Sequence, residues 1–275
     1  MSGRLLLVGE SDVGKSHFGG QLLGRLNREE GVLRMDGAAP NLSAFETVMA
    51  RLHSGRAAPH TSRDQYVESN WPLIDAEGRK SELVWPDYGG EQVRSIREMR
   101  SMPQAWRDRI ATTSGWIVMV RIAHNQLSDD IFTRPLAEPG GQRRPEAPFA
   151  VSPQARLVEL LQWMMFVRGT NTLTPVTHPP LMLLLSCWDE LPAAEADAEP
   201  ITVLRARMPM VAAFAEANWA PNALTVMGLS ALERPLSEDA VDEEFVDRGP
   251  EAFGYVVKPD GQRDRDLTLA IAAMP

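Results

Sequence analysis

The amino-acid sequence predicts an α/β fold, in which helices cover both faces of a mostly parallel, six-stranded sheet with one antiparallel edge strand. Two observations lead to this prediction. Short apolar runs typical of buried strands alternate along the chain with segments whose apolar residues recur at helical spacing. The chain also opens with a strand-like run that passes through a glycine-rich turn directly into a helical pattern.

The opening turn has the sequence Gly-Glu-Ser-Asp-Val-Gly-Lys-Ser at residues 9–16. It follows a predicted strand at 4–9 and precedes a predicted helix at 14–28, which is the context of a phosphate-binding P-loop and predicts a P-loop NTPase. The glycines let backbone N–H groups surround a phosphate, and the helix directs its positive end at the same anion. We expect Lys15 to place its charge between the terminal phosphates, where it also assists catalysis, and Ser16 to ligate Mg²⁺. The predicted nucleotide-contacting residues here are Gly9, Glu10, Ser11, Asp12, Val13, Gly14, Lys15, Ser16 and His17.

The other elements follow from periodicity and turn signals. The first helix contains Gly19 and Gly20, which we expect to allow close packing against the sheet or a neighbouring loop. Further helices are predicted at 42–52, 91–110, 152–169, 203–217 and 267–273, with a kink or restart at Pro209. Strands are predicted at 65–74 and 81–85, which form a hairpin, at 115–122, 181–186 and 224–229, and as a short run at 255–257.

Length, charge and cysteine content limit the kinds of protein that fit. A chain of 275 residues with one phosphate-binding loop predicts a single domain (1–275), with an irregular insertion at 124–151 and a C-terminal extension at 233–275. A net charge of −9 argues against nucleic-acid binding. No apolar run is long enough to span a bilayer, no signal peptide or lipidation motif is visible, and the one cysteine, Cys187, fits a reducing compartment. We therefore expect a cytoplasmic protein without a membrane anchor.

The sequence Asp-Tyr-Gly-Gly-Glu at residues 87–91 follows the predicted strand at 81–85. In a nucleotide switch, an aspartate at a strand end holds Mg²⁺ through water, and the glycine three residues later offers its N–H to the γ-phosphate. These positions correspond to Asp87 and Gly90. The stretch resembles Ras-like and Arf-like GTPases, and it is most similar to the Trp-Asp-x-Gly-Gly-Gln form of Arf-type and heterotrimeric G-protein domains.

The resemblance covers about residues 4–122 and 180–232, and it implies further contacts. These families place a threonine in the loop before the hairpin, where it reaches the Mg²⁺ and the γ-phosphate. Thr61 is the best match in this sequence, and Ser62 is the second. The predicted metal ligands are therefore Ser16, Thr61 and Asp87.

The sequence Ser-Cys-Trp-Asp at 186–189 resembles the Asn-Lys-x-Asp guanine motif of the same families. It places Asp189 where a carboxylate accepts hydrogen bonds from guanine N1–H and the exocyclic amine, two donors that adenine lacks. Ser186 replaces the asparagine, and Cys187 replaces the lysine whose stem packs on the base. For Trp188 two interpretations stay open, stacking on the base or burial in the core. Ser-Ala-Leu at 230–232 resembles the last base-contacting loop of the family and adds Ser230, Ala231 and Leu232 to the predicted guanine site.

The catalytic glutamine of these families directly follows the γ-phosphate-sensing glycine. Glu91 stands at that position here, and Gln92 comes next. Glutamine orients water and donates to a phosphate oxygen, whereas an ionised glutamate only accepts hydrogen bonds and repels phosphate. Either Glu91 orients water or acts as a base, or intrinsic hydrolysis is slow and a partner completes the site, for example with an arginine.

Together these features predict a Mg²⁺-dependent molecular switch that binds GTP and GDP, hydrolyses GTP slowly or with a partner's help, and acts on a protein effector. One alternative is a pseudo-GTPase used as an assembly or adaptor module, which Glu91 and the altered guanine motif favour. Another is an ATPase or small-molecule kinase, which Asp189 and the predicted hairpin oppose. More narrowly, Pro-His-Thr at 59–61, Gly-Gly-Glu at 89–91 and Ser-x-x-Asp-Glu-Leu at 186–191 are similar to the bacterial double-GTPase families of conflict and defence loci.

Overall fold

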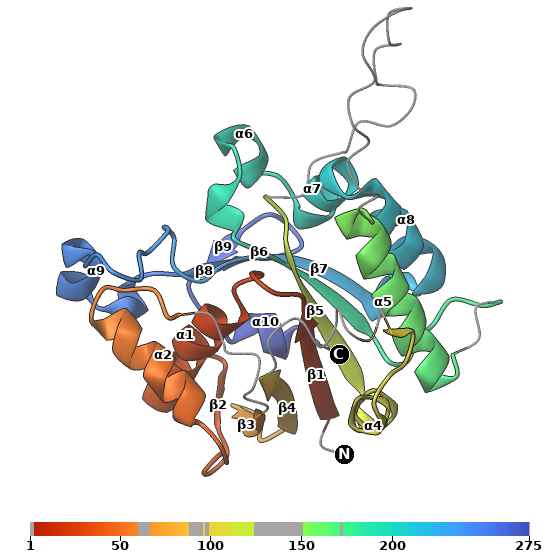
Figure 1. Cartoon of the computed structure of the whole chain (residues 1–275), viewed down its shortest axis with the longest axis horizontal. Coiled ribbons are helices and arrows are strands. Elements are labelled where there is room, and N and C mark those ends of the chain that lie inside the picture. The colour runs from red at the N-terminus through yellow and green to blue at the C-terminus, as the bar shows by residue number, and fades with distance from the viewer. Residues whose placement is uncertain are drawn as a thin grey trace, which may run out of the picture.

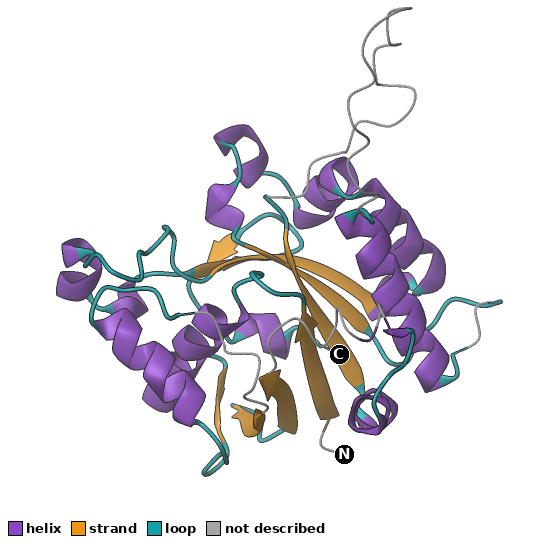
Figure 2. Cartoon of the chain, viewed as in Figure 1, coloured by secondary structure: helices purple, strands orange, loops and turns teal. Residues whose placement is uncertain are grey.

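Figures 1 and 2 show the computed structural model of the chain, which describes residues 3–59, 67–87, 96, 99–123, 151–170 and 173–274. A single sheet lies at its centre. The spatial order of its strands is β2 (Leu33–Met35), β3 (Val67–Asp75), β4 (Lys80–Asp87), β1 (Gly3–Gly9), β5 (Gly115–Arg121), β6 (Leu181–Ser186), β7 (Leu224–Ser230), β8 (Tyr255–Val257) and β9 (Arg263–Asp264). The five strands from β4 to β7 are parallel, while β3 and β8 each pair antiparallel with both of their neighbours.

The α/β class and the mostly parallel sheet are confirmed, but the details of the predicted sheet are wrong in two ways. Nine strands lie in the described part of the chain, where six were expected, and neither antiparallel strand is at an edge. The additional edge strands β2 and β9 have three and two residues. Segments this short show no periodicity, so only their tertiary pairing identifies them.

Two apolar layers form on opposite faces of the sheet because successive strand residues point to opposite sides. On β1, Leu6 and Val8 belong to one layer, whereas Leu5 and Leu7 belong to the other. Figure 1 shows α1 and α2 on one side of the sheet and α5 and α8 on the other. The helices are α1 (Lys15–Arg28), α2 (Ser43–His53), α4 (Gln104–Thr112), α5 (Pro153–Arg168), α6 (Ala193–Ala196), α7 (Pro200–Arg207), α8 (Pro209–Asn218), α9 (Glu243–Arg248) and α10 (Leu269–Ala272).

The two glycines inside α1 allow α2 to pack directly on it. A β-carbon added at Gly19 would lie 2.4 Å from Phe45 Cε1, and one at Gly20 would lie 2.7 Å from Val48 Cγ1. Both neighbours are buried residues of α2. Close packing on the sheet was expected and is present, since a β-carbon at Gly19 would also lie 3.1 Å from Trp85 Cζ2 of β4, but the nearest partner of both glycines is α2.

The ends of α5 match the sequence signals. The hydroxyl of Ser152 accepts a hydrogen bond from the Ala155 N–H at 3.2 Å, Pro153 begins the helix, and Gly169 ends it in a left-handed conformation. The predicted helix at 203–217 is divided at Pro209 into α7 and α8, as expected. Of the predicted helix at 91–110, only the final part falls in a described helix, α4, while 91–95 and 97–98 lie outside the described residues.

Because the carboxyl ends of parallel strands meet at one edge of a sheet, the described residues that follow β1, β5, β6 and β7 gather there. This edge carries the P-loop, Arg121, the segment after Ser186 and Ser230. Across the described ranges, no helix combines the length and apolarity needed to cross a membrane.

Candidate functional site

The P-loop joins β1 to α1 with the geometry that a phosphate cradle requires. Gly14 has a φ of 80°, a left-handed conformation that favours glycine, and α1 begins at the next residue. The Lys15 ammonium donates to the carbonyl oxygens of Gly9 at 2.9 Å and Glu10 at 2.6 Å. The side chain therefore bends back over the loop, which holds its positive charge beside the N-terminus of α1.

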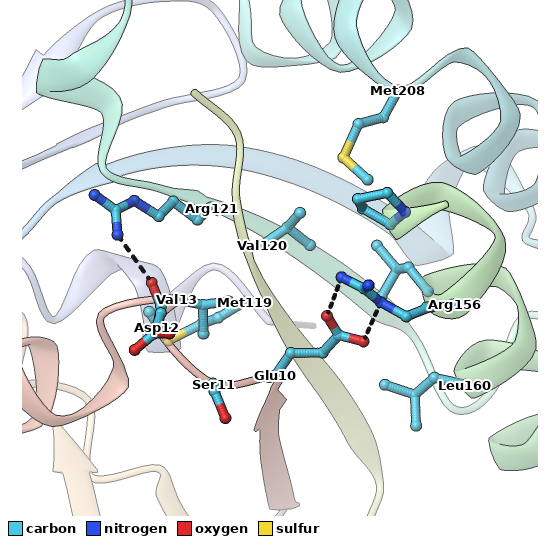
Figure 3. Close-up of a pocket in the computed structure, with 13 residues that line it drawn as sticks. Glu10, Ser11, Asp12, Val13, Met119, Val120, Arg121, Arg156, Leu160 and Met208 are labelled. Atoms are coloured by element: carbon cyan, nitrogen blue, oxygen red, sulfur yellow. Dashed lines mark hydrogen bonds and ion pairs between the residues drawn. The ribbon is translucent and has the colours of Figure 1, made fainter. Parts of the chain in front are cut away.

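An ion pair connects the P-loop to α5. The guanidinium of Arg156 donates to both carboxylate oxygens of Glu10, from Nε at 3.1 Å and from Nη2 at 3.0 Å. The pair lies at an open pocket of about 190 Å³ beside the loop, as Figure 3 shows. Apolar side chains of β5, α5 and the residue between α7 and α8 form much of its wall: Met119, Val120, Leu157, Leu160 and Met208.

A second arginine, at the end of β5, lies on the opposite side of this pocket. Its guanidinium makes a bidentate ion pair with Glu190, in which Nε lies 3.0 Å from Oε2. The same side chain, Arg121, donates from Nη1 to the carbonyl oxygen of Asp12 at 3.4 Å (Figure 3). The hydrogen bond to Glu190 raises the pKa of Arg121 above its ordinary value. The guanidinium is thus permanently charged and joins the P-loop to the segment that follows β6.

Residues 186–190, here named the base loop, turn directly after β6. Asp189 lies in a short 3₁₀ helix (Trp188–Glu190), and its Oδ1 accepts a hydrogen bond from the Ser230 hydroxyl at 2.5 Å. The hydroxyl oxygen in turn accepts from the Glu233 N–H at 2.9 Å. The structure therefore brings together two predicted guanine-site residues, Asp189 and Ser230, and fixes the orientation of the carboxylate.

Cys187 connects the base loop to the P-loop. A β-carbon added at Gly14 would lie 3.9 Å from Cys187 Sγ, so the two loops adjoin at this point. Burial raises the pKa of the Cys187 thiol to about 12, and the nearby Glu190 carboxylate adds to the effect. At neutral pH this side chain is an uncharged thiol and supplies no positive charge in place of a lysine.

Trp188 belongs to the core. Its side chain is fully buried, its Nε1 donates to the Ala196 carbonyl at 2.9 Å, and its ring lies against Gly228 of β7. Of the two interpretations of this residue, burial in the core is the one that the structure supports. The interpretation that Trp188 stacks on the base is wrong, because its indole is fully buried against Gly228.

Three more predicted nucleotide contacts have structural partners. The Nε2 atom of His17 accepts a hydrogen bond from the Ala58 N–H at 3.1 Å, which ties α1 to the segment that leads toward residue 60. Ala231 and Leu232 pack against apolar clusters, so any contact with a base would come from their backbone.

The part of the predicted site that senses and cleaves the γ-phosphate lies outside the described residues. This applies to Thr61, Gly90, Glu91 and Gln92, and to the side chain of Asp87, whose backbone ends β4. Within the described ranges, no group of three or more histidine, cysteine, aspartate or glutamate side chains is arranged to hold a metal ion.

Sequence reasoning missed Arg121 and Arg156, and it noted Glu190 only as part of the Ser-x-x-Asp-Glu-Leu motif. One signal was available for Arg121, since it is a charged residue at the carboxyl end of a buried strand, where ligand sites of α/β sheets form. For Arg156 no local signal existed, because it lies 146 residues from its partner Glu10.

Several solved structures are similar to this chain. The GTPase-like domain of S. cerevisiae Ski7, bound to GTP, has 12% identity, a TM-score of 0.42, and coverage of 84% of this chain and 43% of its own. Sup35 complexed with GDP has 12% identity and a TM-score of 0.37, and the match covers 89% of this chain but only 40% of the Sup35 chain. The signal recognition particle receptor complex SRb-GTP/SRX from Chaetomium thermophilum has 13% identity and a TM-score of 0.39, with coverage of 96% and 99%.

Sequence comparison supplies the family. Curated protein sequences gave no significant match. A model of the family described as Double-GTPase 1 matches residues 6–274, which include the P-loop, the base loop and the C-terminal extension. Because this match extends over nearly the whole sequence, the chain belongs to the Double-GTPase 1 family and carries a GTP-binding, GTPase-like domain.

Proposed function

We propose that this protein is a Mg²⁺-dependent molecular switch that binds GTP and GDP and hydrolyses GTP slowly or with the help of a partner. The observation that carries the proposal is the position of Asp189. Its carboxylate is held by Ser230 at 2.5 Å, in a loop that adjoins Gly14 of the P-loop. The carboxylate proposed to recognise the base therefore lies in a loop next to the proposed phosphate cradle, which supports the binding of one nucleotide across both.

Phosphate binding in this proposal rests on the P-loop. The positive end of α1 and the backbone N–H groups of the loop attract the anion, and Lys15 adds a point charge. Its ammonium is held by the carbonyl oxygens of Gly9 and Glu10, so little reorganisation is needed when a phosphate arrives.

Magnesium fits the oxygen donors of this region. The hydroxyl of Ser16, at the second residue of α1, is an oxygen donor of the kind that Mg²⁺ prefers, and Thr61 and Asp87 are the proposed further ligands. When bound, the ion neutralises charge that develops on the phosphates during transfer. This chain's contribution is to hold the phosphates and the attacking water in line, with Glu91 or Gln92 as the proposed water-orienting group.

Guanine selectivity in this proposal comes from Asp189. A carboxylate accepts hydrogen bonds from guanine N1–H and its exocyclic amine, whereas adenine presents an acceptor at the first position and no amine at the second. The acceptors of the wrong complex would stay unpaired, which disfavours ATP.

A pseudo-GTPase that uses the same fold as an assembly or adaptor module is the second candidate. The neutral, half-buried thiol of Cys187 favours it, because the packing lysine of the guanine motif is absent. A cytoplasmic location, the single-domain organisation and a protein effector or activator are proposed alongside the switch function.

A titration tests the proposal. Binding of labelled GTP, GDP and ATP would be measured with Mg²⁺ and with EDTA, on wild type, on Lys15→Ala and on Lys258→Ala. Lys258 is the matched control, because it is a lysine of the C-terminal extension whose ammonium donates to the nearby Gln262 at 3.0 Å. We expect guanine nucleotides to bind tightly with Mg²⁺, Lys15→Ala to abolish binding, and Lys258→Ala to behave as wild type. The absence of binding by wild type would favour the adaptor function, and equal affinity for ATP and GTP would remove the guanine assignment.

A further inference from the structure

Arg121 contacts two loops that are far apart in the sequence. It lies at the end of β5, pairs with Glu190 of the base loop, and donates to the Asp12 carbonyl of the P-loop at 3.4 Å. Figure 3 shows the side chain reaching from its strand toward Asp12. Only 28% of the Arg121 side chain and 27% of the Glu190 side chain are exposed. The pair is therefore shielded in part from solvent, where a bidentate, charge-assisted contact is stronger than on an open surface.

The ion pair between Arg121 and Glu190 also affects Asp189, because Glu190 is its neighbour in the chain. Glu190 directly follows Asp189 in a 3₁₀ helix of three residues, so the two side chains share one short, rigid turn. Asp189 is anchored on its own side by the Ser230 hydroxyl at 2.5 Å. Arg121 supplies a second anchor of the turn, and this anchor adds a charged link to the P-loop beside the contact between Cys187 and Gly14.

We propose that Arg121 is a positioning residue that determines base specificity, because it holds the base loop against the P-loop and so fixes where the Asp189 carboxylate lies relative to the bound phosphates. The inference rests on the proposed guanine-nucleotide binding and adds a residue that the sequence motifs do not contain. Without Arg121 the P-loop still binds phosphate, but the base loop loses its fixed distance from it. Discrimination between bases then falls, while phosphate binding persists.

Inosine diphosphate provides the probe for this role. It differs from GDP by the missing exocyclic amine, so the ratio of GDP affinity to IDP affinity reports one hydrogen bond to the Asp189 carboxylate. In wild type we expect a ratio of about five or more, the value of one well-placed hydrogen bond. In Arg121→Gln we expect the ratio to fall toward one, while the affinity for inorganic pyrophosphate stays within about twofold of wild type.

Two further variants separate positioning from general damage. Glu190→Ala breaks the same pair from its other side, so it should lower the ratio similarly, and the Arg121→Gln/Glu190→Ala double variant should be no worse than either single one. The control is Arg205→Gln, which removes an ion pair with Glu216 on the surface of α7 and α8, in which Nε and Nη2 both donate to Oε1 at 2.9 Å and 2.6 Å. It should change neither the ratio nor the pyrophosphate affinity.

The possible outcomes are distinguishable. A wild type that prefers GDP to IDP, with an unchanged ratio in both Arg121→Gln and Glu190→Ala, would overturn the role of Arg121 and leave the proposed function intact. An equal loss of GDP, IDP and pyrophosphate affinity would also overturn it, since Arg121 would then only support the fold. A wild type that binds GDP and IDP equally would overturn the guanine assignment itself, and this inference with it.

Discussion

Glu10 places a carboxylate in the loop that is proposed to hold phosphate, and Arg156 neutralises it. Both side chains are about two-thirds buried, and the pair is bidentate. If the arginine is removed, the negative charge of Glu10 loses this bidentate partner and faces an approaching polyphosphate. Water and salt screen the electrostatic repulsion between the Glu10 carboxylate and the polyphosphate only in part.

We therefore predict that Arg156→Gln weakens GDP binding on the order of fivefold at low ionic strength, and less at high salt. The double variant Glu10→Gln/Arg156→Gln should recover most of the lost affinity, because it removes the negative charge of Glu10 as well. Isothermal titration of the three proteins at two salt concentrations measures both effects. A double variant as weak as the single one would show that Arg156 acts through packing rather than through charge.

Cys187 gives a prediction for pH. Its folded-state pKa of about 12 lies above the ordinary value of 9.0 because of burial. Below pH 9 the thiol is protonated in the folded and unfolded chains alike. As the pH rises from about 9 toward 12, the unfolded chain loses this proton first, so the free energy of unfolding falls by at most about 1.4 kcal/mol per pH unit.

Urea denaturation of wild type and Cys187→Ala between pH 7 and pH 10.5 measures this effect. Wild type should lose stability more steeply than the variant above pH 9, and the two pH profiles should run parallel below it. Contributions of other groups, such as Tyr255 with its raised pKa, are common to both proteins and cancel in the difference. Identical profiles up to pH 10.5 would contradict the burial of the thiol.

Whether a site residue could be predicted depends on how far it lies along the sequence from the residues that it contacts. The P-loop, Asp189 and Ser230 follow buried strands directly, so a local pattern of strand and turn is sufficient to find them. The hydrogen bond between Asp189 and Ser230 spans 41 residues, and the ion pair of Glu10 with Arg156 spans 146. Such contacts depend on how the elements pack, which no local pattern contains.

Helices and strands likewise divide into those that a local pattern predicts and those that only tertiary pairing identifies. The limits of α5 were predictable because Ser152, Pro153 and Gly169 each have a conformational preference of their own. The edge strands β2 and β9 were not, because two or three residues become a strand only when a neighbour pairs with them. Gly19 and Gly20 predicted that another part of the chain packs closely on α1, but only the fold shows that its nearest partner is α2.

At the scale of the whole molecule, the C-terminal extension connects the parts of the candidate site. Its strands β8 and β9 continue the sheet beyond β7, and the Ser237 carbonyl accepts from the Ala57 N–H at 2.8 Å. The Gly55 carbonyl accepts from the Asp242 N–H at 2.9 Å. The backbone that leads toward the proposed switch residue Thr61 is therefore held by the same extension whose Glu233 N–H donates to the Ser230 hydroxyl.

Arg25, a buried arginine on the helix that begins at the P-loop, also contacts the extension. Only 4% of Arg25 is exposed, and its guanidinium donates to the Phe253 carbonyl at 2.6 Å and to the Gln21 side-chain oxygen at 2.8 Å. Burial lowers its pKa, while the neighbouring Glu251 carboxylate opposes this change. One turn later, Arg28 reaches the same Glu251 at 2.7 Å, but half of its side chain is exposed. The same helix thus offers a buried and an exposed contact with one segment of the extension.

We predict that Arg25→Met lowers the free energy of unfolding by about 3 kcal/mol, because it leaves buried carbonyl oxygens without donors. The matched control Arg28→Met should lose no more than about 1 kcal/mol, since an exposed ion pair contributes little. Urea denaturation followed by circular dichroism measures both values, and proteolysis of the native proteins shows whether the extension opens first. Glu233 of the extension donates to the Ser230 hydroxyl, which in turn holds Asp189 of the base loop. Arg25→Met should therefore release GDP faster than Arg28→Met does at the same temperature. Equal stability of the two variants would mean that the extension is attached to α1 only at its surface.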